Sequence, residues 1–146
     1  MSIIIGIDPG VSGAIALFDM TDKRVTCHDL PDTTAGLHSL VSSFPPVIGA
    51  MVEKPFYPKV IGVQNVARIA EAYGKIISTL AWRGIPMRET RPVEWKAALN
   101  LSSHKSASRE LAGLFFPDDA DQWKRVRDDG RAESALLAWY GMGKFK

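Results

Sequence analysis

The chain has 146 residues, of which 46% are hydrophobic and 23% charged, the proportions of an ordinary globular protein. This length suits one domain with its own core and is too short for a two-lobed ATPase or for a dehydrogenase with a separate substrate domain. The 18 basic and 16 acidic side chains nearly cancel to a net charge of +2, which neither requires nor excludes a nucleic-acid partner.

Three short strands are predicted at the start of the chain. The first is a continuous apolar, β-branched run that stops at the turn signal Asp8-Pro9-Gly10. Because tight turns separate the three strands, they favour an antiparallel meander. A short helix from a cap at Thr33 or Thr34 to about Ser43 and a fourth apolar strand follow. The strands are expected over residues 3–7, 13–18, 24–30 and 47–52.

The second half of the chain is mainly helical. The longest helix is predicted over residues 63–82, where apolar residues recur with a period of 3.6 and indicate a core stripe or a dimer interface. A fifth strand over 85–90 and three helices follow. A charged loop at 117–128 precedes the last of these helices. The helices are expected over 92–99, from 102 or 103 to 116, and over 129–140. This order predicts an α/β fold: a mixed five-stranded sheet, three antiparallel strands and then parallel ones, flanked by helices.

Carboxylates stand where core elements end. Asp8 follows the first buried strand and Glu53 follows the fourth, so parallel pairing of these strands would bring both to one sheet edge. Their repulsion would be relieved by a hard divalent cation, Mg²⁺ or Mn²⁺. Asp129 and Glu133 share one face of the last helix. Taken singly, each acid also fits a structural role: a turn former, a solvated side chain or a helix cap.

Four segments resemble a known family in order and over almost the whole chain. They are Ile5-Gly6-Ile7-Asp8-Pro9-Gly10 with Ser12-Gly13, Val52-Glu53-Lys54-Pro55-Phe56, Arg91-Pro92-Val93-Glu94-Trp95-Lys96 with Ser103-His104-Lys105-Ser106, and Asp129-Gly130-Arg131-Ala132-Glu133-Ser134-Ala135-Leu136-Leu137-Ala138. They resemble the RuvC-type Holliday junction resolvases of the RNase H-like superfamily, in the form seen in phage and prophage-like members. The resemblance implies an RNase H-like fold and one nuclease domain over residues 1–146.

The last acidic segment departs from the family pattern. Housekeeping members end in two aspartates three residues apart, whereas the spacing here is four and position 133 is Glu. Asp128 precedes Asp129, so either could be the ligand. We favour Asp129 because it shares a helix face with Glu133.

The resemblance implies phosphodiester hydrolysis by two Mg²⁺ or Mn²⁺ ions, with 5′-phosphate and 3′-hydroxyl products. Asp8 would bridge the ions, and Glu53, Asp129 and Glu133 would complete the ligand set. Lys96 and Lys105 correspond to the family's basic segment and would neutralise charge at the scissile phosphate or position the backbone. No cofactor other than the metal is expected.

The expected partner is branched DNA, a four-way junction in particular. Phe56 would stack at the junction crossover with Tyr57 beside it, although both rings could instead cap the core. Further phosphate contacts are expected from four basic residues, Lys54, Lys59, Arg91 and Arg109. With the four acids held against metal, 18 basic residues face 12 acidic ones, which strengthens the expectation of a DNA partner.

A junction is nearly two-fold symmetric, so a homodimer is expected, with its interface on the 63–82 helix or on the basic helices between 92 and 116. The first alternative is another RNase H-like nuclease acting on flaps, other branched DNA or RNA–DNA hybrids. Less expected are a non-catalytic nucleic-acid-binding module and an ATP-binding fragment of the actin-like kind. With no signal peptide or apolar run of membrane-span length, we expect a cytoplasmic protein (in the host cytoplasm if phage-encoded) that has no membrane partner.

Overall fold

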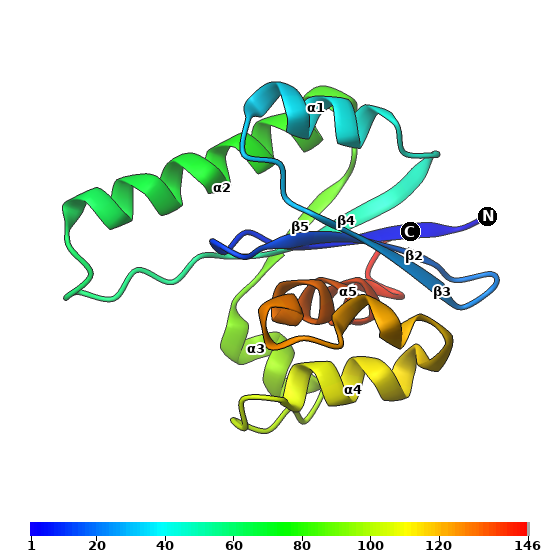
Figure 1. Cartoon of the computed structure of the whole chain (residues 1–146). Helices are drawn as coiled ribbons and strands as arrows, with labels where there is room; N and C mark the ends of the chain where they lie inside the picture. Colours follow the sequence, from blue (N-terminus) through cyan, green and yellow to red (C-terminus); the bar gives the residue numbers. More distant parts are fainter. Residues whose placement is uncertain (146) are drawn as a thin grey trace.

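A five-stranded mixed sheet forms the centre of the computed structural model, which describes residues 1–145 (Figure 1). Its order is β3-β2-β1-β4-β5; β1 pairs antiparallel with β2 and β2 with β3, while β1, β4 and β5 run parallel. The predicted α/β fold class is confirmed. The strands are β1 (Ile3–Asp8), β2 (Ala14–Asp19), β3 (Arg24–Asp29), β4 (Val47–Glu53) and β5 (Met87–Thr90).

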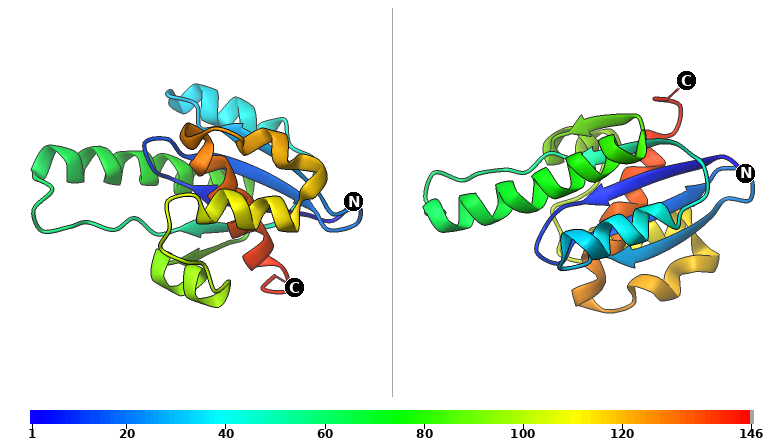
Figure 2. Two further views of the ribbon diagram at one scale, coloured as in Figure 1. Left: turned by 60° about the horizontal axis from the view of Figure 1, so that its bottom comes forward. Right: turned by 90° about the horizontal axis from the view of Figure 1, so that it is seen from above.

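Helices lie on both faces of the sheet (Figures 1 and 2). One face is covered by α1 (Thr34–Ser42) and α2 (Val63–Arg83), and Thr33 caps α1 as predicted. The other side holds α3 (Pro92–Ala98), α4 (Ala107–Phe115) and α5 (Asp129–Gly141). The last helix, α5, packs directly across β1 and β2, so its first turns lie beneath the end of the central strand.

Alternation along β1 divides the core into two layers. Ile5 and Ile7 pack with the buried residues of α1 and α2, whereas Ile4 packs with the buried residues of α5. The same alternation in β4 sends Val52 toward α2 and Met51 toward α5. Both strands are buried on both faces and therefore consist of nearly continuous apolar residues.

Two glycines allow α5 to approach the sheet closely. A Cβ on Gly6 would lie 2.0 Å from the Ser134 carbonyl oxygen, and one on Gly130 would lie 1.9 Å from the Ser12 carbonyl oxygen. Both contacts are with backbone, so neither can be relieved by a side-chain rotation. The two glycines thus fix the depth at which the first turns of α5 meet the loop after β1.

Two sequence predictions on the α5 side are wrong. The fourth helix, α4, begins at Ala107 rather than at 102 or 103, because the preceding residues form turns in which His104 Nδ1 and Ser106 Oγ share a 2.9 Å hydrogen bond. The expected loop at 117–128 contains two 3₁₀ helices, Pro117–Trp123 and Val126–Asp128. The first is fastened to β3 by buried Asp119, which accepts hydrogen bonds from the Arg24 guanidinium and the Val25 amide.

The predicted apolar stripe of α2 serves the core only in part. Ile76 and Leu80 are buried, but Val66, Ile69 and Tyr73 are only half-buried. Figures 1 and 2 show why: residues 54–62 run out beyond the sheet and return as the first turns of α2, so this end of the helix projects from the body. We call residues 54–75 the arm. Within residues 1–145, no helix combines the length and the apolar character needed to cross a bilayer.

Candidate metal centre and nucleic-acid interface

Asp8 and Glu53 meet at one edge of the sheet because their strands are parallel neighbours. Ile7 pairs with Val52, so the next residue of each strand is one of the two acids. The period of two places Asp8 on the same face as Ile4 and Gly6, and Glu53 on the same face as Met51, which is the face covered by α5. The sequence prediction that both carboxylates emerge together is confirmed.

The third carboxylate comes from α5. One oxygen each from Asp8, Glu53 and Glu133 lie within 4.8 Å of one another, although Glu133 is 125 residues from Asp8 in the chain. The close approach of α5 to β1 at Gly6 and Gly130 brings Glu133 to this position. We call these three residues the acidic cluster.

Burial makes the acidic cluster a poor place for uncompensated negative charge. Desolvation raises the pKa of Asp8 to about 7, the Gly10 amide at 3.0 Å opposes this, and the charges of Glu133 and Glu53 add to it. Desolvation likewise raises the pKa of Glu53. A hard cation would relieve both effects, and an all-oxygen donor set is the one that Mg²⁺ and Mn²⁺ prefer. The cluster therefore fits a divalent metal ion.

Neighbouring side chains hold two of the three carboxylates in place. The buried indole of Trp95 on α3 donates a hydrogen bond from Nε1 to Glu53 Oε2 at 2.6 Å. Glu133 Oε1 lies 3.1 Å from Lys96 Nζ and accepts a hydrogen bond from Ser108 Oγ, also at 3.1 Å. Sequence reasoning missed Trp95 and Ser108, because a tryptophan and a serine on short helices carry no signal that distinguishes them from packing or capping residues.

The structure does not bring Asp129 into the acidic cluster. Its carboxylate is ion-paired with Arg109 Nε at 2.7 Å, one helical turn before Glu133. Asp128 is buried and receives two hydrogen bonds from the Arg125 guanidinium and one from the Arg125 amide. Of the two aspartates, Asp129 lines the same cavity as Glu133, whereas Asp128 is hydrogen-bonded to Arg125 within its own turn.

A cavity of about 480 Å³ opens beside the acidic cluster, a volume suited to a ligand group. Its walls combine hydroxyl and basic groups with the two acids of α5. The lining residues are Lys96, Leu101, Ser102, Ser103, His104, Lys105, Ser108, Asp129 and Glu133. This surface could receive a phosphate next to bound metal, with Lys96 and Lys105 both in its wall.

The other predicted basic residues are more scattered. Lys54 is directed to Glu89 of β5, with Nζ 3.9 Å from a carboxylate oxygen, and Arg91 forms a 2.8 Å ion pair with Glu94. Arg109 is committed to Asp129, and Lys59 is exposed on the arm. Lys96 and Lys105 therefore line the cavity, and Arg109 contacts the cavity residue Asp129. Lys54 and Lys59 lie in the arm, and Arg91 is held by Glu94 at the start of α3.

The aromatic pair on the arm does not cap the core. Phe56 is 73% exposed and Tyr57 40% exposed, and both follow Glu53 within four residues. The alternative in which both rings cover the core is therefore wrong. An exposed phenyl ring this close to a carboxylate cluster is available for stacking on an unpaired base.

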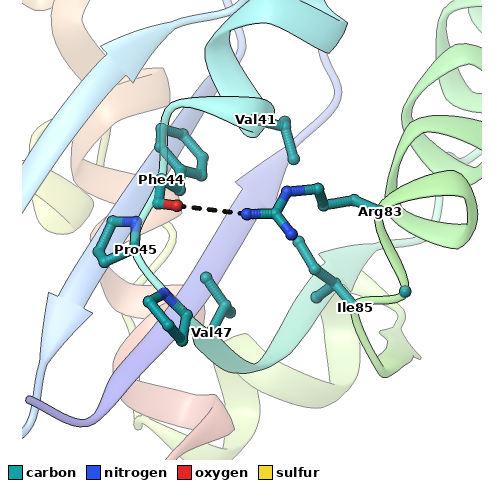
Figure 3. Close-up of a pocket in the computed structure, with 8 residues that line it drawn as sticks. Val41, Phe44, Pro45, Val47, Arg83 and Ile85 are labelled. Carbon is teal, nitrogen blue, oxygen red and sulfur yellow. Dashed lines mark hydrogen bonds between the residues drawn. The ribbon is translucent and has the colours of Figure 1, made fainter.

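A second cavity lies at the other end of β4 (Figure 3). There the Arg83 guanidinium donates a 3.5 Å hydrogen bond to the Phe44 carbonyl oxygen. Its volume of about 210 Å³ is smaller than typical ligand pockets, which occupy roughly 300–1,000 Å³. Among residues 1–145 no carboxylate lines it, and it shares no residue with the acidic cluster. The lining residues are Val41, Phe44, Pro45, Pro46, Val47, Arg83, Gly84 and Ile85.

Comparisons with known proteins agree with the geometry. The chain is 27% identical to a crossover junction endodeoxyribonuclease RuvC of Prochlorococcus marinus strain MIT 9313 and 29% identical to that of strain MIT 9211, over 94% of this chain and 97% and 96% of the relatives. Thermus thermophilus RuvC solved with a Holliday junction substrate superposes with a TM-score of 0.72 at 16% identity, covering 100% of this chain and 99% of that one.

A second Thermus thermophilus RuvC structure gives a TM-score of 0.68 at 16% identity, with 99% and 98% coverage. No family model matches the chain. The resemblance to RuvC noted in the sequence is therefore confirmed, and the RNase H-like fold with it.

Proposed function

We propose that this RuvC-like chain is a divalent-metal-dependent endonuclease that resolves four-way DNA junctions by paired phosphodiester hydrolysis. The observation that carries the proposal is the acidic cluster, three carboxylates from β1, β4 and α5 within 4.8 Å, beside a cavity lined by Lys96 and Lys105. The curated relatives are named crossover junction endodeoxyribonucleases, and one fold neighbour was solved with a Holliday junction.

The proposed ligands are Asp8, Glu53 and Glu133, with Asp129 as a fourth ligand after release from Arg109. When bound, one or two Mg²⁺ or Mn²⁺ ions supply Lewis-acid activation of water and of the leaving 3′ oxygen. Asp8 ends the central strand, which pairs with β4 and packs against α5, and it is therefore the carboxylate that we propose would be shared if two ions bind. Cleavage would leave 5′-phosphate and 3′-hydroxyl ends.

The cavity next to the cluster is the proposed site of the scissile phosphate. Lys105 is exposed in its wall and Lys96 lies beside Glu133, so two ammonium groups can neutralise charge on the phosphate oxygens. The hydroxyl groups of Ser102 and Ser103 border the same space and can donate hydrogen bonds to a DNA backbone. These contacts position DNA without reading its sequence.

The arm is the proposed structure-selective element. Phe56 would stack on a base at the crossover, where pairing is already strained, with Tyr57 beside it. Lys59, Lys54, Arg91 and Arg109 are proposed phosphate contacts, the last three after exchanging their present acidic partners for phosphates.

A homodimer joined through the arm is part of the proposal. The projecting turns of α2 expose Val63, Ala67, Ala70 and Gly74 at helical spacing, a narrow apolar face that permits close approach of a second helix. Two-fold symmetry would present one acidic cluster to each of two symmetry-related strands of a four-way junction. One nuclease domain over residues 1–146 and a cytoplasmic location remain predictions from the sequence.

A cleavage assay tests the function directly. The full chain is incubated with a four-way junction, a flap, an RNA–DNA hybrid and a linear duplex, each with Mg²⁺ or Mn²⁺, and product ends are mapped. We expect symmetric cuts in the junction alone, with 5′-phosphates. Preferred cleavage of the flap or the hybrid would contradict junction resolution and would support the alternative RNase H-like nuclease activity. Binding of DNA without cleavage of any substrate would indicate a non-catalytic nucleic-acid-binding module.

A further inference from the structure

We propose that Trp95 is a positioning residue of the metal centre, whose indole N–H holds the Glu53 carboxylate in the orientation that binds the divalent ion. This inference rests on the proposed function in that it takes the acidic cluster as a metal site. It adds a residue from α3, an element that contributes no carboxylate to the cluster.

The hydrogen bond is short and well enclosed. Trp95 Nε1 lies 2.6 Å from Glu53 Oε2, and the indole ring is fully buried within the core on the α5 side. The α3 helix that carries it begins at Pro92 and is closed at its first turn by the Glu94 carboxylate, which accepts from the Arg91 amide at 3.1 Å. Because the Trp95 ring is buried and α3 is capped, the indole N–H has a fixed direction toward Glu53.

The Trp95 indole N–H is the hydrogen-bond donor that the half-exposed Glu53 carboxylate needs. Glu53 is only half-exposed at the end of β4, so its orientation depends on hydrogen-bond donors from the protein. The indole N–H of Trp95 supplies such a donor at 2.6 Å and ties the carboxylate to the core. It engages Oε2, and Oε1 accepts no hydrogen bond from residues 1–145. One oxygen is thus fixed and the other is available to a cation.

The next residue of α3 contacts a second carboxylate of the acidic cluster. Lys96 Nζ lies 5.4 Å from the centre of the Trp95 ring and 3.1 Å from Glu133 Oε1. Consecutive residues of α3 therefore contact two of the three carboxylates of the acidic cluster. A role limited to core packing would require only the ring of Trp95, whereas the positioning role requires its N–H.

Trp95→Phe separates these two roles, because it keeps an aromatic ring in the core and removes the N–H. Binding of Mn²⁺ to the DNA-free full chain is measured by calorimetry for the wild type, Trp95→Phe and the control Trp82→Phe, which changes an exposed ring on α2. Loss of a hydrogen bond that supports a metal ligand typically weakens affinity about 10–100-fold, which is the result expected for Trp95→Phe. The control should bind as the wild type does.

A second measurement does not depend on the variant folding. In ¹H–¹⁵N spectra of the wild type, the assigned Trp95 indole resonance should lie downfield and should move on titration with diamagnetic Mg²⁺, at the same midpoint as metal binding. The Trp82 indole should not move. An unmoved Trp95 resonance in a chain that binds Mg²⁺ would overturn the inference, as would a folded Trp95→Phe protein with wild-type Mn²⁺ affinity.

The two proposals fail differently. If the wild type binds Mn²⁺ with Trp95-dependent affinity but cuts no junction, the positioning role is supported and junction resolution is not. If the wild type cuts junctions while Trp95→Phe binds Mn²⁺ equally well, only the positioning role falls.

Discussion

Lys96 Nζ lies 3.1 Å from Glu133 Oε1, so the first basic residue of the cavity is already ion-paired with a proposed metal ligand. Lysine and a divalent cation compete for that carboxylate, because each neutralises the same charge. Once a cation holds Glu133, the ammonium group becomes available to a phosphate in the adjoining cavity. In the proposed function, this contact would couple metal binding at Glu133 to phosphate binding by Lys96.

Lys96→Met should separate the two consequences of that contact. Removing the competing ammonium group should tighten Mn²⁺ binding several-fold, while loss of phosphate neutralisation should slow junction cleavage by about 10²-fold. Calorimetry and single-turnover cleavage measure the two quantities. Lys23→Met is the control, because Lys23 is exposed in the turn between β2 and β3, outside the cavity and the arm. Weaker Mn²⁺ binding in Lys96→Met would contradict the competition.

Asp8→Asn should abolish metal-dependent cleavage and leave junction binding largely intact. The amide has nearly the same shape but cannot supply the negative charge that a divalent ligand set requires. Cleavage and gel-shift titration of the same junction give the two measurements, with exposed Asp32→Asn as the control. Cleavage retained by Asp8→Asn would remove Asp8 from the ligand set.

The raised pKa of Asp8 predicts that the free energy of unfolding of the metal-free protein falls as pH rises. Because the pKa of Asp8 is about 7 in the folded chain and 3.8 for an ordinary aspartate, the folded chain binds the proton more tightly than the unfolded chain does. Stability is then present in full below pH ~4 and is lost as pH rises through about 7, at up to about 1.4 kcal/mol for each pKa unit. Asp8→Asn lacks this loss.

Thermal unfolding in chelator from pH 5 to 8 measures that prediction as the difference between the wild type and Asp8→Asn. Other carboxyls with lowered pKa, such as Asp119 beside Arg24, have the opposite pH dependence and cancel in the difference. Mn²⁺ should stabilise the wild type more at pH 8 than at pH 6, because binding must displace the Asp8 proton. A difference that does not vary with pH would rule out the raised pKa.

Phe56→Ala should impair junctions more than linear duplexes. Stacking on an unpaired base is worth about 1–3 kcal/mol, or roughly 5- to 150-fold in affinity, and a linear duplex offers no unpaired base. Competition binding with both DNAs measures the ratio. Leu114→Ala is the control, since Leu114 is equally exposed on α4. Equal losses on both DNAs would exclude stacking at the crossover.

Ala70→Arg should convert the proposed dimer into a monomer. A long charged side chain on the exposed face of the arm blocks close helix packing and costs nothing in the folded chain, since Ala70 is exposed. Light scattering after gel filtration gives the mass, and Ala35→Arg on α1 is the matched exposed control. A wild type that is monomeric at all concentrations, or an Ala70→Arg protein that stays dimeric, would move the interface elsewhere or remove it.

Elements with a strong local signal are already determined by the sequence. The apolar runs of β1 and β4 predict buried strands, because strands enclosed on both faces consist mainly of apolar residues. Gly84 predicts the end of α2, because glycine readily adopts the left-handed conformation that ends helices, and Gly84 has φ 71° in the structure. Asp8 and Glu53 could be placed together on the condition that the first and fourth strands pair in parallel, which the structure confirms. The late start of α4 and the 3₁₀ helices at 117–128 could not be, because turn hydrogen bonds and buried Asp119 decide them.

Only the tertiary structure decided which groups form the site. Asp129 and Glu133 share a helix face, yet Glu133 alone joins the acidic cluster while Asp129 turns to Arg109 from α4. The contact of Trp95 with Glu53 joins residues 42 positions apart, through the depth at which α3 packs. The sequence therefore determines which acids end the core strands, because burial patterns are local. The ligand set and its supporting bonds depend on helix packing distances that no local pattern contains.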